Sequence, residues 1–290
     1  MTKTEGSRGQ DPSRVIAPPD AQKEGEIFDR FDFGSAQIKG PSKHEQQDYC
    51  TVAFPMEGDW WAAVVADGAS WAEHAAEASN LAGTSFVEKV RRRAERGEEI
   101  NSATIKMFLQ TINVELLAKS RANERVAIER ANAKKLVGQE RDREIGRAID
   151  RPTTFEGMVF NGDKIITAHL GDSRIYVLRA GVLSQLTRDQ TRAEQLRSRG
   201  QPVKNARDES VLINYLGYEE ADVSVQQYSV EKGDVWLAVS DGVFKVLDDK
   251  EIEVILSQQK DAVSLANELI AAVQVKGAFD DASAVVVKIK

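Results

Sequence analysis

The most chemically suggestive feature of this sequence is a set of aspartates that adjoin short, mainly apolar segments. Asp67, Asp172 and Asp241 each follow such a segment, and Asp280-Asp281 precedes another. The segments are residues 60–66, 165–171, 235–240 and 282–289. They are rich in β-branched or aromatic residues, which is typical of strands buried on both faces. If the strand ends meet, the carboxylates share one rim, where like charges are tolerated only beside neutralising cations. The pattern therefore predicts a site for hard divalent ions.

Each Asp-Gly pair taken alone has a simpler interpretation as a tight turn after a strand. Asp bonds to its own backbone and Gly adopts positive φ, so Asp67-Gly68 and Asp241-Gly242 both suit turns. The recurrence of aspartate at several strand ends is harder to explain by turn chemistry. On the residues alone, both interpretations stay open.

The composition indicates a globular protein and restricts its partners. With 290 residues and 41% hydrophobic content, the chain can bury a sizeable core. Its net charge of −7 argues against binding to nucleic acid, whose protein partners carry a basic stripe or arm. No apolar run is long enough to span a bilayer and the N-terminus lacks a hydrophobic signal core, so we expect no membrane partner and a cytoplasmic location. Cys50 is the only cysteine, and a buried, inert thiol is expected.

One domain is expected from residue 27 to residue 290, after a polar leader. Residues 1–26 are polar and contain several prolines, so we expect them to be disordered. Residues 119–150 are highly charged and alanine-rich, with alternating signs, which predicts a solvated helical extension. This extension is either a structural arm or a surface that docks a partner, such as a cognate Ser/Thr kinase.

The other segments predict antiparallel sheets covered by pairs of helices. Asn161-Gly162 and Ala180-Gly181 lie between strand-like segments and are hairpin signals. No strand–helix–strand alternation appears, which favours an α+β fold. The expected helices are 72–96, one from 101 or 102 onwards, 191–199, 249–257 and 262–273. The expected strands are 28–38, 48–54, 60–66, 154–160, 164–170, 173–179, 182–186, 223–230, 235–240 and 282–289, with a further segment at 211–217.

Seven short motifs, taken in order, resemble the metal-dependent type 2C serine/threonine protein phosphatases, with this chain as a divergent, bacterial-like member. Any one motif is weak, but the ordered set is specific and covers about residues 28–289. The two most specific are Gly171-Asp172-Ser173-Arg174-Ile175-Tyr176 and Ser240-Asp241-Gly242. The others are Lys43-x-x-Gln46-Gln47-Asp48, Val65-Ala66-Asp67-Gly68, Thr153-Thr154, Leu186-Thr187-x-Asp189 and Asp280-Asp281-Ala282-Ser283.

The resemblance implies both a fold and a metal site. The fold is a four-layer αββα sandwich, in which two antiparallel sheets are flanked by antiparallel helix pairs. The site holds two Mn²⁺ or Mg²⁺ ions. Asp67 would bridge both ions, with the Gly68 carbonyl as a further ligand, and Asp241 and Asp280 would bind one of them.

Four further residues complete the implied site. Asp172 would serve a third, weaker ion together with Asp241, and Asp48 would hold waters. Gln47 stands where the family has a metal-binding glutamate, so the second ion should bind more weakly, because an amide oxygen carries no negative charge. Lys43 aligns with an arginine that orients phosphate, and it supplies charge without the bidentate fork.

The implied reaction is hydrolysis of phosphoserine or phosphothreonine in a phosphorylated protein, by a monomeric enzyme. Two ions would activate a water and neutralise the phosphoryl oxygens, with Lys43, Asp67 and Asp241 as the catalytic residues. The alternative is a pseudophosphatase, a module that binds a phosphoprotein or kinase with little turnover, as Gln47 and Lys43 suggest. A two-metal nuclease fits the carboxylates but not the acidic charge balance.

Three side chains near the motifs have competing interpretations. His169 is expected to be a hydrogen-bonded core residue. Trp71 either packs or shapes access to the site. His74 is interpreted as a packing or solvated residue rather than as a general acid, which leaves protonation of the leaving group to a water.

Overall fold

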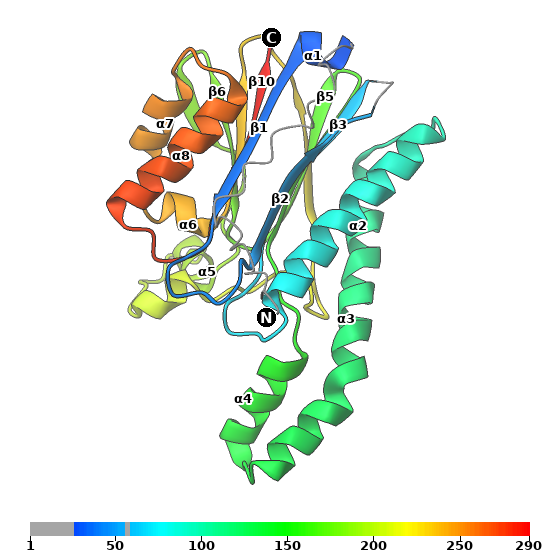
Figure 1. The fold of residues 1–290 in the computed structure, drawn as a ribbon, viewed down its shortest axis with the longest axis vertical. Coiled ribbons are helices and arrows are strands. Elements are labelled where there is room, and N and C mark those ends of the chain that lie inside the picture. The colour runs from blue at the N-terminus through cyan, green and yellow to red at the C-terminus, as the bar shows by residue number, and fades with distance from the viewer. Residues whose placement is uncertain (1–25, 56–58) are drawn as a thin grey trace, which may run out of the picture.

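The computed structural model describes residues 26–55 and 59–290, which form two five-stranded sheets packed face to face (Figure 1). All neighbouring strands are antiparallel. The first sheet contains, in order, β1 (Phe31–Ile38), β10 (Ala282–Ile289), β9 (Val235–Val239), β6 (Arg174–Arg179) and β7 (Val182–Gln185). The second contains β2 (Asp48–Ala53), β3 (Trp60–Asp67), β4 (Phe155–Asn161), β5 (Lys164–Leu170) and β8 (Ser224–Ser229). The predicted disordered leader, apart from Glu26, lies outside the described residues.

Aromatic side chains fill the space between the two sheets. Trp61 on β3 and Trp236 on β9 are fully buried there. The Trp61 ring stacks on that of Phe160 with centroids 6.0 Å apart, and Phe31 contacts both rings edge on. Alternate residues of the same strands face the helices, so the central strands are buried on both sides, which explains their continuous apolar sequence.

A pair of long helices covers the outer face of the second sheet, and a shorter pair covers the first. α2 (Ala75–Glu95) and α3 (Ser102–Ala133) pack on the second sheet, and α7 (Asp249–Leu256) and α8 (Ala262–Lys276) on the first (Figure 1). Three of these helices begin after a residue whose side chain accepts a backbone N–H of the first turn. These capping residues are Asn101, Asp248 and Asp261. The layers run helix, sheet, sheet, helix, which confirms the predicted α+β class.

The charged stretch forms a helical arm, here called the α3–α4 arm (residues 119–149), which extends beyond one end of the sandwich (Figure 1). α3 runs into it without a break, and α4 (Gly138–Ile149) returns after a short turn. Arg130 on α3 pairs with Glu73 (2.8 Å), and the backbone N–H of Glu73 donates to the carbonyl oxygen of Arg147 on α4 (2.8 Å). The base of the arm is therefore fastened to the loop that follows β3.

Three elements differ from what the sequence indicated. Residues 28–30 belong to α1 (Glu26–Arg30), whose Phe28 ring packs against Phe33 on β1 and Phe54 just after β2. Residues 241–244 form the one-turn helix α6 (Asp241–Phe244) rather than a turn alone. The segment 211–217 makes only isolated bridges, to residues just before β4 and α5. The remaining short helices are α5 (Arg192–Ser198) and η1 (Ala206–Glu209).

Two sequence-based expectations concern isolated features of the chain. Cys50 is buried, and burial raises the pKa of its thiol to about 12, so it is an inert core residue as expected. In the described ranges, no helix combines the length and the apolar character needed to cross a bilayer.

Trp61→Ala is expected to lower the free energy of unfolding by about 3–5 kcal/mol, because the indole is fully buried and its loss leaves a cavity between the sheets. Val126→Ala, at an exposed position on α3, is the matched control and should change it by less than ~0.5 kcal/mol. Urea unfolding followed by circular dichroism measures both. Similar small effects for the two variants would contradict the packing described above.

Candidate functional site

Strand register brings the predicted carboxylates of the first sheet to one end. Val239 on β9 is the cross-strand partner of both Arg174 on β6 and Ala284 on β10. Asp172 lies two residues before the start of β6, Asp241 follows β9 after Ser240, and Asp280 lies two residues before the start of β10. Because neighbouring strands are antiparallel, these three positions fall at the same edge of the sheet.

Two more aspartates reach the same end from the second sheet. Asp48 on β2 and Asp67 on β3 are direct cross-strand partners. The Ser240 hydroxyl donates to Asp48 Oδ2 (2.7 Å), while the Ser240 backbone N–H donates to the carbonyl oxygen of Ser283 on β10 (3.1 Å). A single serine beside Asp241 therefore connects the two sheets at the carboxylates.

Four of the predicted site residues line one cavity of about 620 Å³. They are Asp67, Asp172, Asp241 and Asp280. Trp71, Tyr215 and Phe279 contribute aromatic surface to its wall, so Trp71 borders the site. Sequence separation between the four carboxylates is large, and the fold alone brings them together.

Two threonines fix the end of β3 that carries Asp67. The Asp67 backbone N–H donates to Thr154 Oγ1 (2.9 Å), and the Asp67 carbonyl oxygen accepts from Thr153 Oγ1 (3.0 Å) and from the Thr154 N–H (2.8 Å). The next residue, Gly68, has no room for a side chain, because a Cβ atom there would lie 2.3 Å from the carbonyl oxygen of Ala75. The Thr153-Thr154 and Asp67-Gly68 motifs are thus parts of one local structure.

Burial and mutual repulsion raise the pKa values of the gathered carboxyl groups. For Asp67 burial is the largest cause, followed by the charges of Asp48 and Asp241. Burial, together with neighbouring carboxylates, raises the pKa of Asp48 and that of Asp172 to about 7 in each case. Within the described part of the chain, Asp48 Oδ1 is buried without a hydrogen-bond partner. The site therefore carries more negative charge than its own cations neutralise.

Asp281 has a role that the sequence did not reveal, since it holds the loop in front of β2. Its Oδ1 accepts from the Gly40 N–H (2.7 Å) and its Oδ2 accepts from the Gln47 N–H (2.7 Å). The carboxylate thereby fixes the position of Gln47, one of the predicted ligands. The sequence shows two adjacent aspartates. It does not show that Asp281 supports this loop while Asp280 lines the cavity.

Lys43 lies in the same loop and its ammonium group is fully engaged. It contacts Asp280 Oδ1 (2.7 Å), Gln47 Oε1 (2.8 Å) and Ser70 Oγ (2.6 Å). Burial lowers its pKa and the neighbouring carboxylates, chiefly Asp280, raise it, with a net upward shift. Lys43 and Gln47 therefore join the carboxylates, although neither lines the cavity itself.

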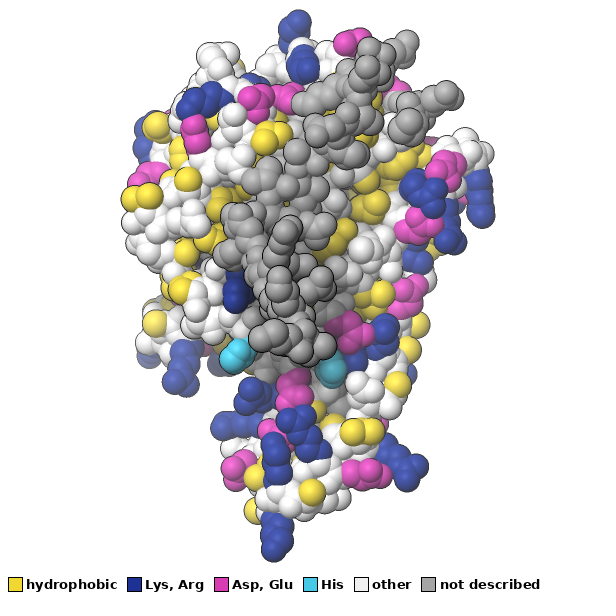
Figure 2. Space-filling model, in the orientation of Figure 1, with side chains coloured by type: hydrophobic (Ala, Val, Ile, Leu, Met, Phe, Trp, Pro, Cys, Tyr) yellow, Lys and Arg dark blue, Asp and Glu magenta, His cyan; other side chains and the backbone are white. Residues whose placement is uncertain are grey.

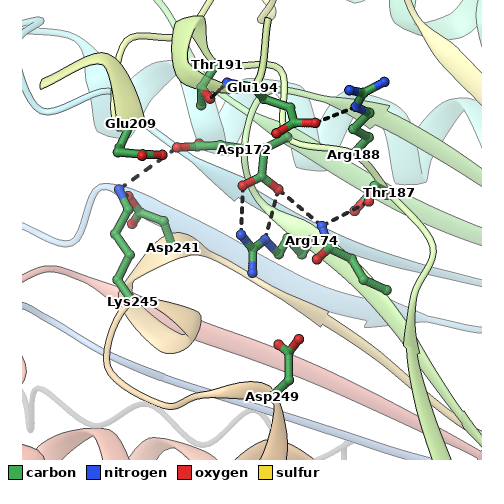
Figure 3. Close-up of polar contacts among 12 residues, drawn as sticks. Asp172, Arg174, Thr187, Arg188, Thr191, Glu194, Glu209, Asp241, Lys245 and Asp249 are labelled. Carbon is green, nitrogen blue, oxygen red and sulfur yellow. Dashed lines mark hydrogen bonds and ion pairs between the residues drawn. The ribbon is translucent and has the colours of Figure 1, made fainter. Parts of the chain in front are cut away.

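Lys245 is a cavity-lining residue for which the sequence motifs gave no role. It stands one turn after Asp241 at the end of α6, and its ammonium group pairs with Asp241 and approaches Asp172 (Figure 3). The four-residue spacing from Asp241 was a signal that could have been used, since residues i and i+4 share a helix face. The sequence alone does not reveal this signal, because the four-residue α6 leaves no helical pattern to detect.

The predicted donor set fits hard divalent cations. The ligand positions offer oxygen atoms, and no His or Cys is found among the described residues that line the cavity. The described ranges contain no group of three acidic, His or Cys side chains that could hold an ion unaided. Waters and backbone oxygens such as the Gly68 carbonyl would complete the coordination, as is usual for Mg²⁺. Cations at this place would also relieve the repulsion that raises the carboxyl pKa values.

His169 is a hydrogen-bonded core residue, as expected. Its Nδ1 shares a hydrogen bond with Glu156 Oε1, and its Nε2 with the carbonyl oxygen of Arg188 (2.8 Å). Burial raises the pKa of Glu156 to about 7, against the effect of His169. His74, at the start of α2, lies within 3.5 Å of Glu77 and is not among the cavity-lining residues.

Comparisons with known proteins agree on one family. A family model described as "Protein phosphatase 2C" matches residues 41–274. Serine/threonine protein phosphatase PstP of Mycobacterium tuberculosis is 30% identical over 104 residues, which are 34% of this chain and 20% of PstP. Serine/threonine phosphatase stp of Listeria monocytogenes is 27% identical over 141 residues, which are 47% of this chain and 56% of the relative. The matched regions thus span little more than half of these relatives at most.

A solved structure extends the likeness to the whole fold. The catalytic domain of PstP in complex with two manganese ions matches with a TM-score of 0.68 and 21% identity, covering 90% of this chain and 98% of that one. At this level of identity the match shows the shared two-sheet architecture.

The stability of the metal-free protein is expected to fall as pH rises from about 4 to about 7. Asp48 and Asp172 titrate near 7 when folded but at about 3.9 when unfolded, so the folded state binds more protons in that interval. Asp172→Asn removes one of these groups and should stabilise the metal-free protein more at pH 8 than at pH 5. Urea unfolding in a chelator measures the difference. Equal stabilisation by Asp172→Asn at both pH values would contradict this prediction. Asp163→Asn, in the exposed turn between β4 and β5, is the control and should not show this pH dependence.

Proposed function

Because the chain belongs to the protein phosphatase 2C family, we propose that it hydrolyses phosphoserine or phosphothreonine in proteins with Mn²⁺ or Mg²⁺ as cofactor. The observation that carries the proposal is the convergence of Asp67, Asp172, Asp241 and Asp280 on one cavity from two sheets. The PstP catalytic domain binds two manganese ions, and we propose a pair of ions for this chain as well.

The proposed ligands are those that the resemblance to the family implies, and three of them line the cavity. Asp67 would contact both ions, with the carbonyl oxygen of Gly68 as a further ligand. Asp241 and Asp280 would hold one ion, and Gln47 would reach the other. Asp48, which is buried and already bonded to Ser240, would hold waters rather than an ion.

When bound, the cations would lower the pKa of a water that attacks phosphorus and would neutralise the phosphoryl oxygens. The chain itself contributes position. Thr153 and Thr154 fix the backbone of Asp67, and Asp281 fixes the backbone of Gln47, so the ligands do not need to be ordered during the reaction.

Lys43 would orient the substrate phosphate. An ammonium group has three N–H donors, and in this structure all three face acceptors on Asp280, Gln47 and Ser70. It would bind phosphate by exchanging one of these hydrogen bonds for a bond to a phosphoryl oxygen. Since no histidine is found among the described cavity-lining residues, the proton for the leaving hydroxyl is expected from a water.

The aromatic wall of the cavity would contact the peptide that carries the phosphate. Trp71 and Phe279 are about half exposed, with 45% and 52% of their surface accessible, and both line the cavity. Flat aromatic surface of this kind binds peptide segments without demanding one sequence.

The α3–α4 arm is the proposed place for a macromolecular partner such as a cognate Ser/Thr kinase. The arm, residues 119–149, contains nine Lys or Arg and five Asp or Glu, although the whole chain has a net charge of −7. Figure 2 shows the basic side chains along the surface of the arm, with acidic ones between them.

A cytoplasmic location and a monomeric state are further predictions for the protein.

A pseudophosphatase is the second candidate, and one contact favours it. Lys43 Nζ donates to Gln47 Oε1 (2.8 Å), so the amide that replaces a charged ligand is already occupied. A protein of this kind would bind a phosphoprotein without metal and without turnover.

Para-nitrophenyl phosphate hydrolysis separates the two candidates. Turnover is expected with Mn²⁺ and should disappear on chelation. Asp241→Asn should reduce kcat/KM by about 100-fold or more, since even residues that only support ligands cost 10–100-fold. Asp163→Asn, exposed in the β4–β5 turn, should leave it unchanged. Absence of turnover with Mn²⁺, together with metal-independent binding of a phosphoprotein, would establish the pseudophosphatase instead.

Gln47→Glu is expected to tighten Mn²⁺ binding, because a carboxylate adds a full negative charge at the second ion. Calorimetric titration with Mn²⁺ measures the affinity, and the activity should rise at limiting Mn²⁺. Gln139→Glu adds the same charge at an exposed position on α4 and should change neither. An unchanged titration for Gln47→Glu would remove Gln47 from the metal site.

A further inference from the structure

Lys245 places a positive charge between two of the cavity carboxylates. Its Nζ pairs with Asp241 Oδ2 and lies 4.0 Å from Asp172 Oδ2 (Figure 3). A third contact, to Ser210 Oγ (3.4 Å), comes from the segment just after η1. The side chain of Asp172 is only 8% exposed and that of Lys245 28%, so the pair is largely shielded from water.

The backbone of Lys245 is held in place by its surroundings. Its N–H donates to the carbonyl oxygen of Asp241 (3.0 Å), which closes the single turn of α6. The preceding Phe244 lies under the guanidinium of Arg174, 3.8 Å from the ring centroid, and Arg174 forms two hydrogen bonds with Asp189 (2.9 and 2.8 Å). These contacts hold α6 against β6 and position the lysine beside the two carboxylates.

A divalent ion and this ammonium group cannot share the space between Asp172 and Asp241. Mg²⁺ needs ligand oxygens at about 2.0–2.1 Å, whereas the ammonium group already contacts one carboxylate and approaches the other. The two cations would also repel each other at short range in a shielded cavity. The lysine has the further advantage that it is tethered to the chain and is present at high local concentration whatever the metal supply.

We propose that Lys245 is a built-in cation that takes the place of a third divalent ion between Asp172 and Asp241. The inference rests on the proposed function, because it concerns the metal content of the same site. It replaces the expectation, drawn from the family resemblance, that Asp172 serves a third ion together with Asp241.

Calorimetric titration of the full chain with Mn²⁺ tests this proposal. Lys245→Met removes the charge but keeps an unbranched apolar side chain, and it is expected to bind one more Mn²⁺ ion than the native chain. The extra ion should disappear again in Lys245→Met/Asp172→Asn. Lys245→Arg retains the charge and should give the native count. Lys250→Met, at an exposed position on α7, is the matched control and should also give the native count.

Two results would overturn the proposal. One is an equal count for Lys245→Met and the native chain when circular dichroism shows that both are folded. The other, which needs no change at Lys245, is a lower count for Asp172→Asn than for the native chain, because Asp172 would then ligate an ion beside the lysine. An unchanged count for Asp172→Asn supports the proposal.

Phosphatase assays on the same samples keep this inference separate from the proposed function. A native chain that shows the expected counts but hydrolyses no phosphate ester with Mn²⁺ would contradict the phosphatase and leave the role of Lys245 standing. A native chain that is active but shows the opposite counts would contradict the role of Lys245 alone.

Discussion

The close approach of several carboxylates at one end of the sandwich is the constraint on which the rest of the site depends. Asp48 and Asp67 face each other across two strands, and burial adds to their repulsion. Such an arrangement opposes folding unless positive charge is supplied. Hydrogen bonds between the backbone of Asp67 and the two threonines after α4 hold the end of β3 in place, so this strand end does not relax by simple fraying. Because the fold holds these carboxylates close together, the folded protein is stabilised by cations that bind between them.

Two lysines from different elements neutralise part of this negative charge. Lys43 reaches Asp280 from the loop before β2, and Lys245 reaches Asp241 from α6. Each lysine lies within a few residues of a predicted site residue, so its position is determined locally once that element has formed. Neither brings the two charges of a divalent ion, and the pKa values of Asp48 and Asp172 stay raised. Because repulsion between the carboxylates remains, a divalent cation suits the cavity better than a further lysine would.

The sequence predicted the strands and the shared edge of carboxylates because both depend on short-range patterns. Buried strands are continuously apolar, and the aspartates stand directly at their ends. It did not predict that Asp281 would support a loop while Asp280 faced the cavity, since that choice depends on contacts 234 to 241 residues away along the chain. Lys245 was overlooked for a different reason. A four-residue helix leaves no periodicity to detect, and without the helix the spacing from Asp241 has no meaning.

Closure of the sandwich and assembly of the site are coupled through one hydroxyl group. Ser240 belongs to the first sheet, accepts the Ser283 N–H with its Oγ (2.9 Å) and donates from the same atom to Asp48 on the second sheet (2.7 Å). All three residues are buried, so an unmade bond would leave a polar group without a partner. The two sheets can therefore pack fully at this end only when Asp48 has reached the first sheet. Since Asp48 is paired with Asp67, that step also brings Asp67 to Asp241, which follows β9, and to Asp280, which precedes β10. The fold and the charged site consequently form together, and any cation that stabilises the site stabilises the contact between the sheets as well.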